Sequence, residues 1–195
     1  MTRALFIVDV QNDFTEGGAL GVDGGKAVAG RITAHLSAHA GDYDLIIASR
    51  DWHEGDSDNG GHFASGDAEP DFVDTWPVHC VAGTAGAEYD PGFDTTPVTH
   101  HVKKGQGIPA YSLFEGVTDA GETVADLLTA HGVVDVDVVG IATDYCVRAS
   151  ALDAIAHGRH VRVFTDLIAG VAPDSSENAL AELAHAGADL KESTR

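Results

Sequence analysis

Positive charge is scarce in this chain. Only 11 of its 195 residues are lysine or arginine, against 31 aspartates and glutamates, and the formal net charge is −20. Nucleic acids and anionic membranes attract proteins through lysine and arginine. The charge balance therefore argues against both as partners, and we expect a small-molecule ligand instead.

Cysteine and long apolar runs are also rare. Two cysteines in a chain of this length do not make a disulfide framework. The apolar run at 4–8 is too short for the core of a signal peptide, and no segment approaches the roughly 20 apolar residues of a membrane span. We therefore expect a cytoplasmic protein. A hydrophobic content of 44% is typical of a globular protein, and the length predicts one domain over residues 1–195.

Short apolar segments alternate with helical patterns along most of the chain. The sequence predicts strands at 4–10, 45–49, 133–141 and 159–164, a weaker strand near 98–102 and an edge strand at 188–191. It predicts amphipathic helices at about 25–40, 121–130, 144–156 and 174–186. This alternation indicates an α/β fold with three layers, α/β/α, around a central, mostly parallel, Rossmann-like sheet of about six strands.

The segment from about 51 to 96 breaks this alternation, because it is rich in glycine, aspartate, proline and aromatic residues without a sustained period. A compact domain seldom keeps so long an irregular stretch without a functional reason. Ligands of parallel α/β sheets bind beyond the carboxyl ends of the strands. We therefore expect the site at that edge, where the irregular segment begins.

Three residues at predicted strand ends form a first candidate group: Asp9, Lys104 and Cys146. Cys146 lies at a strand-to-helix turn, where the helix dipole and a nearby ammonium favour the thiolate, the nucleophilic form of cysteine. A carboxylate in contact with both groups can take the thiol proton and return it to a leaving amine. Taken singly, each residue also fits a structural role: Asp9 as a loop cap, Lys104 as a solvated side chain and Cys146 as a small core residue.

A second candidate group suits a metal ion. Asp51 and His53 alternate along an extended segment, so their side chains share a face, and His62 and His79 could fold back towards them. Carboxylate and imidazole ligands are compatible with zinc, iron or manganese. The acidic segment between His53 and His62 is long, which leaves the place of His62 open. Cys80 fits better as a buried small residue than as a ligand.

These residues occur in motifs that resemble the nicotinamidases of the isochorismatase-like (cysteine hydrolase) superfamily. The matching segments are 8–14 (VDVQNDF), 50–53 (RDWH), 76–81 (WPVHCV), 104–105 (KG), 110–112 (AYS) and 140–147 (GIATDYCV). They follow the family order from residue 5 to about residue 150. The Asp-Trp-His and Trp-Pro-x-His-Cys motifs are the part specific to nicotinamidases.

The resemblance implies the hydrolysis of nicotinamide to nicotinic acid and ammonia, a step of NAD salvage, with pyrazinamide as a further candidate substrate. It implies that Cys146 attacks the carboxamide to form a thioester, that Asp9 shuttles the proton and that Lys104 stabilises the thiolate. It also implies a cis peptide bond at Ile141–Ala142 and an oxyanion hole formed by the backbone amides of Ala142 and Cys146. One divalent metal ion would be bound by Asp51, His53, His79 and His62. The aromatic side chains that would hold the pyridine ring are Phe14, Trp76 and Tyr111.

Several alternatives stay open at this point. Phe14, Trp76 and Tyr111 could be ordinary core residues. The chain could be a related amidohydrolase that acts on a carbamoyl or ureido substrate, although the metal motif argues against it. An isochorismatase proper would not need Cys146, and a non-catalytic metal-binding or scaffold domain would not need the catalytic group. The metal could be zinc, iron or manganese, and the chain could form a homo-oligomer.

Overall fold

The computed structural model describes residues 2–66 and 68–194. Its six-stranded sheet has the order β3-β2-β1-β4-β5-β6, and every neighbouring pair is parallel. The strands are β1 (Arg3–Val8), β2 (Leu45–Asp51), β3 (His100–Lys104), β4 (Asp135–Ile141), β5 (His160–Ala169) and β6 (Asp189–Lys191). The predicted α/β class with a parallel sheet of about six strands is confirmed.

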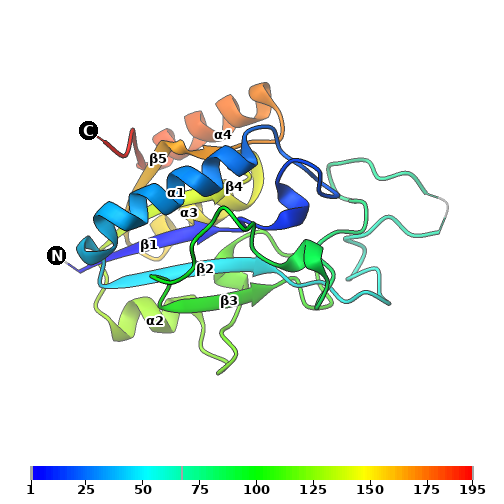
Figure 1. Cartoon of the computed structure of the whole chain (residues 1–195), viewed down its shortest axis with the longest axis horizontal. Helices are drawn as coiled ribbons and strands as arrows, with labels where there is room; N and C mark the ends of the chain where they lie inside the picture. The colour runs from blue at the N-terminus through cyan, green and yellow to red at the C-terminus, as the bar shows by residue number, and fades with distance from the viewer. Residues whose placement is uncertain (1, 67, 195) are drawn as a thin grey trace.

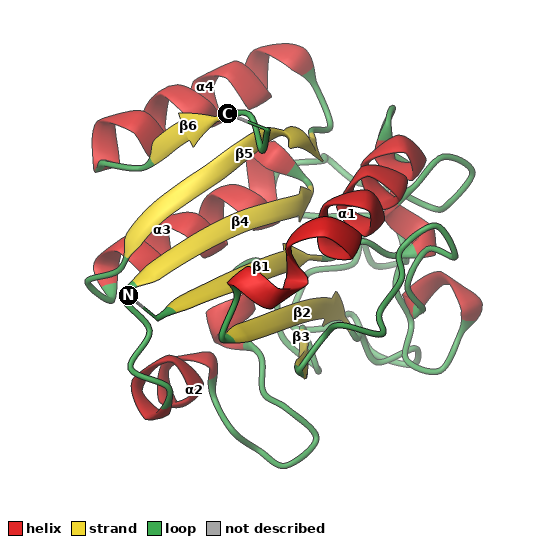
Figure 2. Ribbon diagram, turned by 60° about the vertical axis from the view of Figure 1, so that its left-hand side comes forward, coloured by secondary structure: helices red, strands yellow, loops and turns green. Residues whose placement is uncertain are grey.

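Helices cover both faces of this sheet (Figure 2). They are α1 (Gly25–His39), α2 (Val124–Ala130), α3 (Arg148–Ala156) and α4 (Pro173–Ala186). Short 3-10 turns lie at η1 (Asn12–Phe14), η2 (Ala40–Asp42), η3 (Ala85–Ala87) and η4 (Leu113–Glu115), and a π-helical turn, η5 (Thr143–Val147), precedes α3. The described part of the chain contains no helix that combines the length and the apolar character needed to cross a bilayer.

Alternation along β1 explains the two layers of the core. Leu5 and Ile7 pack on the face covered by α1, with Val28 and Ile32 of that helix. Ala4, Phe6 and Val8 point to the other face, where residues of α2, α3 and α4 cover them. Because successive side chains of a strand point to opposite faces, an unbroken apolar strand indicates burial on both sides.

The element boundaries differ from the prediction where capping or pairing intervenes. Helix α2 begins at Val124 because the hydroxyl of Thr123 caps it and accepts a hydrogen bond from the Asp126 amide. Strand β5 runs on to Ala169, beyond the predicted end at 164, because it resumes its pairing with β4 after an irregularity in register. The predicted helix at 144–156 divides into η5 and α3, so Cys146 lies within the π-helical turn.

The long irregular segment extends beyond the ends of β1 and β2 (Figure 1). Between Asp51 and Ala85 the described residues form turns and isolated bridges, such as those of His53 with Val81 and of Phe63 with Trp76. These bridges fold the segment back on itself next to the strand ends. The segment therefore lies beside the carboxyl edge of the sheet.

Gly140 offers a test of the packing between β1 and β4. Its φ is +120°, and an added Cβ would lie 2.1 Å from the carbonyl oxygen of Val8. We expect Gly140→Ala to lower the free energy of unfolding by about 3 kcal/mol or more, because backbone strain adds to a steric clash. Urea denaturation measures this loss.

The matched control is Gly30→Ala in α1, where an added Cβ meets no atom within 4 Å. This variant should gain about 0.5–1 kcal/mol, because alanine favours the helix. A Gly140→Ala protein as stable as the wild type would contradict this account of the strand packing.

Candidate active site

Four strand ends bring the candidate residues together. Strands β3, β2, β1 and β4 are consecutive neighbours in the sheet. Lys104 and Asp51 are the last residues of β3 and β2, Asp9 follows β1 directly, and Cys146 lies in the turn after β4. Since the carboxyl ends of parallel strands share one edge, residues far apart in the sequence meet there.

The first candidate group is a contact cluster inside the protein. The ammonium nitrogen of Lys104 lies 2.9 Å from Oδ2 of Asp9 and 3.6 Å from Sγ of Cys146. Asp9 and Lys104 are almost entirely buried, and Cys146 is 7% exposed. Ser49 donates a hydrogen bond of 2.7 Å to Oδ1 of Asp9. The structure thus places a thiol, an ammonium and a carboxylate together at the edge of the sheet.

Burial opposes the charged forms in this cluster, whereas the Lys104 ammonium favours them. Burial raises the pKa of the Cys146 thiol well above its usual range, and the Lys104 ammonium offsets this only in part. Burial also raises the pKa of Asp9, against the opposing effect of Lys104. Forming the thiolate therefore calls for a base, and Asp9 is a buried carboxylate whose raised pKa suits it to accept a proton.

Lys104 also contacts Asp51, so one ammonium lies between two buried carboxylates. Burial by itself would lower the pKa of Lys104, but Asp51 and Asp9 raise it well above its usual range. Burial alone would raise the pKa of Asp51, yet Lys104, His53 and His79 hold it well below its usual range. With both carboxylates ionised, one lysine leaves a buried negative charge uncompensated.

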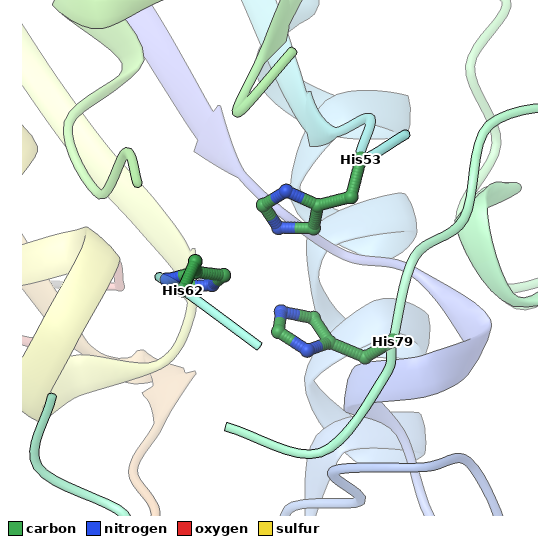
Figure 3. Close-up of side chains that lie close together, drawn as sticks. All are labelled: His53, His62 and His79. Atoms are coloured by element: carbon green, nitrogen blue, oxygen red, sulfur yellow. The ribbon is translucent and has the colours of Figure 1, made fainter. Parts of the chain in front are cut away.

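Three histidines complete the second candidate group. His53, His62 and His79 are buried, and each offers a ring nitrogen within 4.8 Å of the others. Figure 3 shows their rings turned towards one another. Nε2 of His53 lies 3.6 Å from Oδ2 of Asp51, and Nε2 of His79 lies 3.7 Å from the same oxygen. The structure therefore brings His62 to this cluster, although the long preceding loop left its place open.

The hydrogen bonds of these rings leave nitrogens free to bind an ion. Nδ1 of His53 bonds to the carbonyl oxygen of Gly105 at 2.8 Å, and Nδ1 of His79 bonds to that of Pro77 at 2.7 Å. Nε2 of His53 and both ring nitrogens of His62 are buried without a hydrogen-bond partner among the described residues. Buried polar atoms without partners are rare in native proteins unless an ion or water satisfies them.

The donor set fits a divalent metal ion. Burial lowers the pKa of His62 to about 4, so its ring is neutral at pH 7 and able to act as a ligand. Three imidazoles and one carboxylate are compatible with zinc, iron or manganese. The buried negative charge next to Lys104 also favours a cation here. Cys80 is buried and lies outside this histidine cluster, as the sequence predicted.

One cavity connects the two groups. Its volume is about 270 Å³, and both Cys146 and the candidate metal ligands Asp51, His62 and His79 line it. Its walls are largely apolar, and the predicted ring-binding residues Phe14, Trp76 and Tyr111 all belong to them. Trp76 donates a hydrogen bond from Nε1 to the hydroxyl of Tyr111 at 3.0 Å, which fixes two of these aromatic walls relative to each other. A small, flat, aromatic ligand fits such a site.

The peptide bond between Ile141 and Ala142 is cis, as expected. Ala142 lines the cavity beside Cys146. Tyr145, next to Cys146, also lines the cavity, although it was not among the predicted ring-binding residues. Its ring lies edge-on to that of Trp76, with ring centroids 4.9 Å apart. Its direct proximity to Cys146 in the chain was the only signal that pointed to it.

Gln11 is a buried supporting residue that the motif contained without an assigned role. Its side chain donates to the backbone oxygen of Asp51 at 2.9 Å and accepts from the backbone nitrogen of the same residue at 2.8 Å. It also donates to the carbonyl of Ala87. These bonds fix the end of β2, and with it the carboxylate between Lys104 and the histidines. Its place two residues after Asp9, at a strand end, was the available signal.

Comparisons with known proteins extend these observations. The isochorismatase domain model matches residues 3–194. A nicotinamidase/pyrazinamidase of Mycobacterium tuberculosis is 47% identical over 188 residues, which cover 96% of this chain and 97% of that relative. The structure of PnC1 from L. infantum, solved in complex with nicotinate, has a TM-score of 0.84 and a sequence identity of 35%. The match covers 99% of this chain and 93% of the PnC1 chain. A pyrazinamidase of Pyrococcus horikoshii, solved in complex with zinc, has a TM-score of 0.81 and a sequence identity of 34%. This match covers 98% of this chain and 99% of the pyrazinamidase chain.

A parallel α/β sheet whose strand ends gather a buried cysteine, lysine and aspartate is the architecture of a cysteine hydrolase. The family model spans nearly the whole chain, and the relatives above share more than 30% of its residues. The chain therefore belongs to the isochorismatase family, in agreement with the resemblance seen in the motifs.

The histidine cluster yields a prediction about metal binding. We expect His53→Ala to weaken zinc binding by about a hundredfold or more, because it removes an imidazole that Gly105 orients towards the cluster. Competition with a chromogenic chelator measures the affinity. His185→Ala is the control, since His185 is exposed on α4, and a His53→Ala protein that binds zinc as tightly as the wild type would remove His53 from the site.

Proposed function

We propose that this enzyme hydrolyses nicotinamide to nicotinic acid and ammonia through a thioester on Cys146, as a step of NAD salvage. The observation that carries the proposal is the aromatic-walled cavity, which is lined both by Cys146 and by His62 and His79 of the histidine cluster. The relatives' names, nicotinamidase and pyrazinamidase, point to the same substrates. Pyrazinamide, which also joins a ring nitrogen to a carboxamide, is the second substrate that we propose.

The first half of the reaction forms the thioester. Asp9 takes the proton of the Cys146 thiol, and Lys104, 3.6 Å from the sulfur, stabilises the thiolate as it attacks the carboxamide carbon. The amides of Ala142 and Cys146 stabilise the oxyanion, and loss of one such donor typically costs about 3–4 kcal/mol of transition-state stabilisation. Asp9 then returns the proton to the leaving nitrogen, the C–N bond breaks and ammonia departs.

The second half releases the acid. A water molecule takes the place of ammonia, Asp9 accepts a proton from it, and the resulting hydroxide attacks the thioester carbon. The C–S bond breaks, nicotinic acid forms and the thiol of Cys146 is restored by the proton that Asp9 held. Atoms balance over the cycle, because one water is consumed for each ammonia released.

Phe14, Trp76 and Tyr111 would hold the pyridine ring between aromatic walls. Asp51, His53, His62 and His79 would hold a divalent metal ion, with zinc, iron and manganese as the candidates. When bound, this ion would hold the pyridine nitrogen and so orient the carboxamide towards Cys146. The carbamoyl or ureido alternative lacks a ring to fill these walls, which makes it the weaker candidate.

We also propose a cytoplasmic location for the enzyme. Cys80 and Cys146 are both free thiols. A thiol nucleophile suits a reducing compartment, where disulfides rarely form.

The nucleophile has a direct test. We expect Cys146→Ala to lower the rate of ammonia release from nicotinamide at least about a thousandfold, because the change removes the sulfur on which the acyl intermediate forms. Circular dichroism should show an unchanged fold. Cys80→Ala is the matched control, since that cysteine is also buried but does not line the cavity, and it should retain most of the activity. A Cys146→Ala protein that still releases ammonia would disprove the thioester route.

The metal and the substrate are tested together by chelation. Ammonia release from nicotinamide should fall after the protein is treated with a chelator and should return when zinc, iron or manganese is added, because the ion orients the ring. The same comparison with pyrazinamide tests the second substrate. If no metal state releases ammonia from either amide, the proposed substrates are wrong and carbamoyl and ureido amides become the next candidates.

A further inference from the structure

The loop that delivers His62 is organised around one buried side chain. Residues 54–61 connect His53 to His62, and most of them are exposed. Asn59 is the exception, because it is 0% exposed although it lies in the middle of this acidic loop. An asparagine rarely becomes fully buried unless its amide is fully hydrogen-bonded.

The Asn59 amide uses its full donor and acceptor capacity. Its Oδ1 accepts hydrogen bonds from the backbone nitrogens of Glu54 at 2.9 Å and Gly107 at 3.2 Å. Its Nδ2 donates to the carbonyl oxygens of Glu54 at 2.9 Å and Ser57 at 3.1 Å. The backbone has a φ of +51°, a left-handed conformation that asparagine tolerates better than most residues. The side chain therefore closes the loop on itself and ties it to a second loop.

Both of these loops orient a ring of the histidine cluster. The backbone nitrogen of His62 lies 3.4 Å from the carbonyl oxygen of Asn59 and donates to it. Gly107 lies two residues after Gly105, whose carbonyl accepts from Nδ1 of His53. Asn59 thus joins the segment that carries His62 to the segment that orients His53, and Figure 3 shows these two rings facing each other.

His62 depends on its backbone for orientation more than the other two histidines do. His53 and His79 each have a hydrogen bond from Nδ1 to a carbonyl oxygen, whereas neither ring nitrogen of His62 has a partner among the described residues. A ligand without such a bond keeps its geometry only if the chain that carries it is held in place. The bonds of Asn59 provide that restraint.

We propose that Asn59 is a positioning residue for metal binding, which holds the His53–His62 loop so that the His62 ring faces the other two histidines. This inference rests on the metal site of the proposed function. The family motifs do not include the acidic loop between His53 and His62. The inference gives this loop a role, because the loop folds around Asn59, whose four side-chain hydrogen bonds position His62.

A double-mutant cycle on the full-length protein tests this proposal, with zinc as the probe. The variants are Asn59→Gly, which keeps the left-handed backbone but removes the amide, His62→Ala, and the two combined. Each single change should weaken zinc binding by about ten- to a hundredfold. The zinc affinity of the combined variant should equal that of the single variant with the lower affinity, because Asn59 acts through His62.

Two controls separate positioning from general destabilisation. Ile32→Val in the buried face of α1 should lower the stability without changing zinc affinity. Cobalt(II) absorption should show the same altered spectrum for Asn59→Gly as for His62→Ala. Zinc binding by Asn59→Gly equal to that of the wild type, losses that multiply in the combined variant, or a His62→Ala protein with full affinity would each overturn the proposal.

Ammonia release from nicotinamide by the wild-type protein is measured in parallel. If the wild type releases ammonia but the zinc losses multiply, the role of Asn59 fails and the proposed function stands. If the zinc losses are coupled but the wild type releases no ammonia, the substrate proposal fails and the role of Asn59 stands.

Discussion

The ion pairs of Lys104 with two carboxylates are the interactions on which the rest of the site depends. This buried ammonium contacts Asp9 on one side and Asp51 on the other, and its nitrogen lies 3.6 Å from the sulfur of Cys146. Unpaired charges in a protein interior are costly, so each partner holds the others in place. Because the partners come from the ends of four adjacent strands, the order of the sheet determines the composition of the site.

The same lysine links the chemistry to ligand binding. Asp9 and Cys146 lie on the side where a bond would be broken, whereas Asp51 faces the histidine cluster on the other side. Cys146 on one side and His62 and His79 on the other line the same aromatic-walled cavity, so one small ligand can contact both groups. Supporting residues stiffen this arrangement from outside the cavity, as Gln11 does for the backbone of Asp51.

The sequence predicted the layers, the parallel sheet and the strand ends that carry the candidate residues, because buried strands and amphipathic helices leave strong periodic patterns. It did not predict how strongly burial opposes the Cys146 thiolate, since burial depends on every surrounding element. It left His62 open, because a loop without a period does not reveal that a buried side chain such as Asn59 closes it. Local sequence patterns predict helices and strands, whereas the pKa of a buried group and the conformation of a loop depend on tertiary contacts.

The most direct test of a thioester on Cys146 is the partition of the intermediate between two nucleophiles. With hydroxylamine present during turnover, the enzyme should form nicotinic acid and its hydroxamate in a fixed ratio. We expect the same ratio from nicotinamide and from an ester of nicotinic acid, because both substrates would pass through the same acyl-enzyme. Different ratios from the amide and the ester would contradict a common thioester and, with it, the role assigned here to the cysteine, lysine and aspartate.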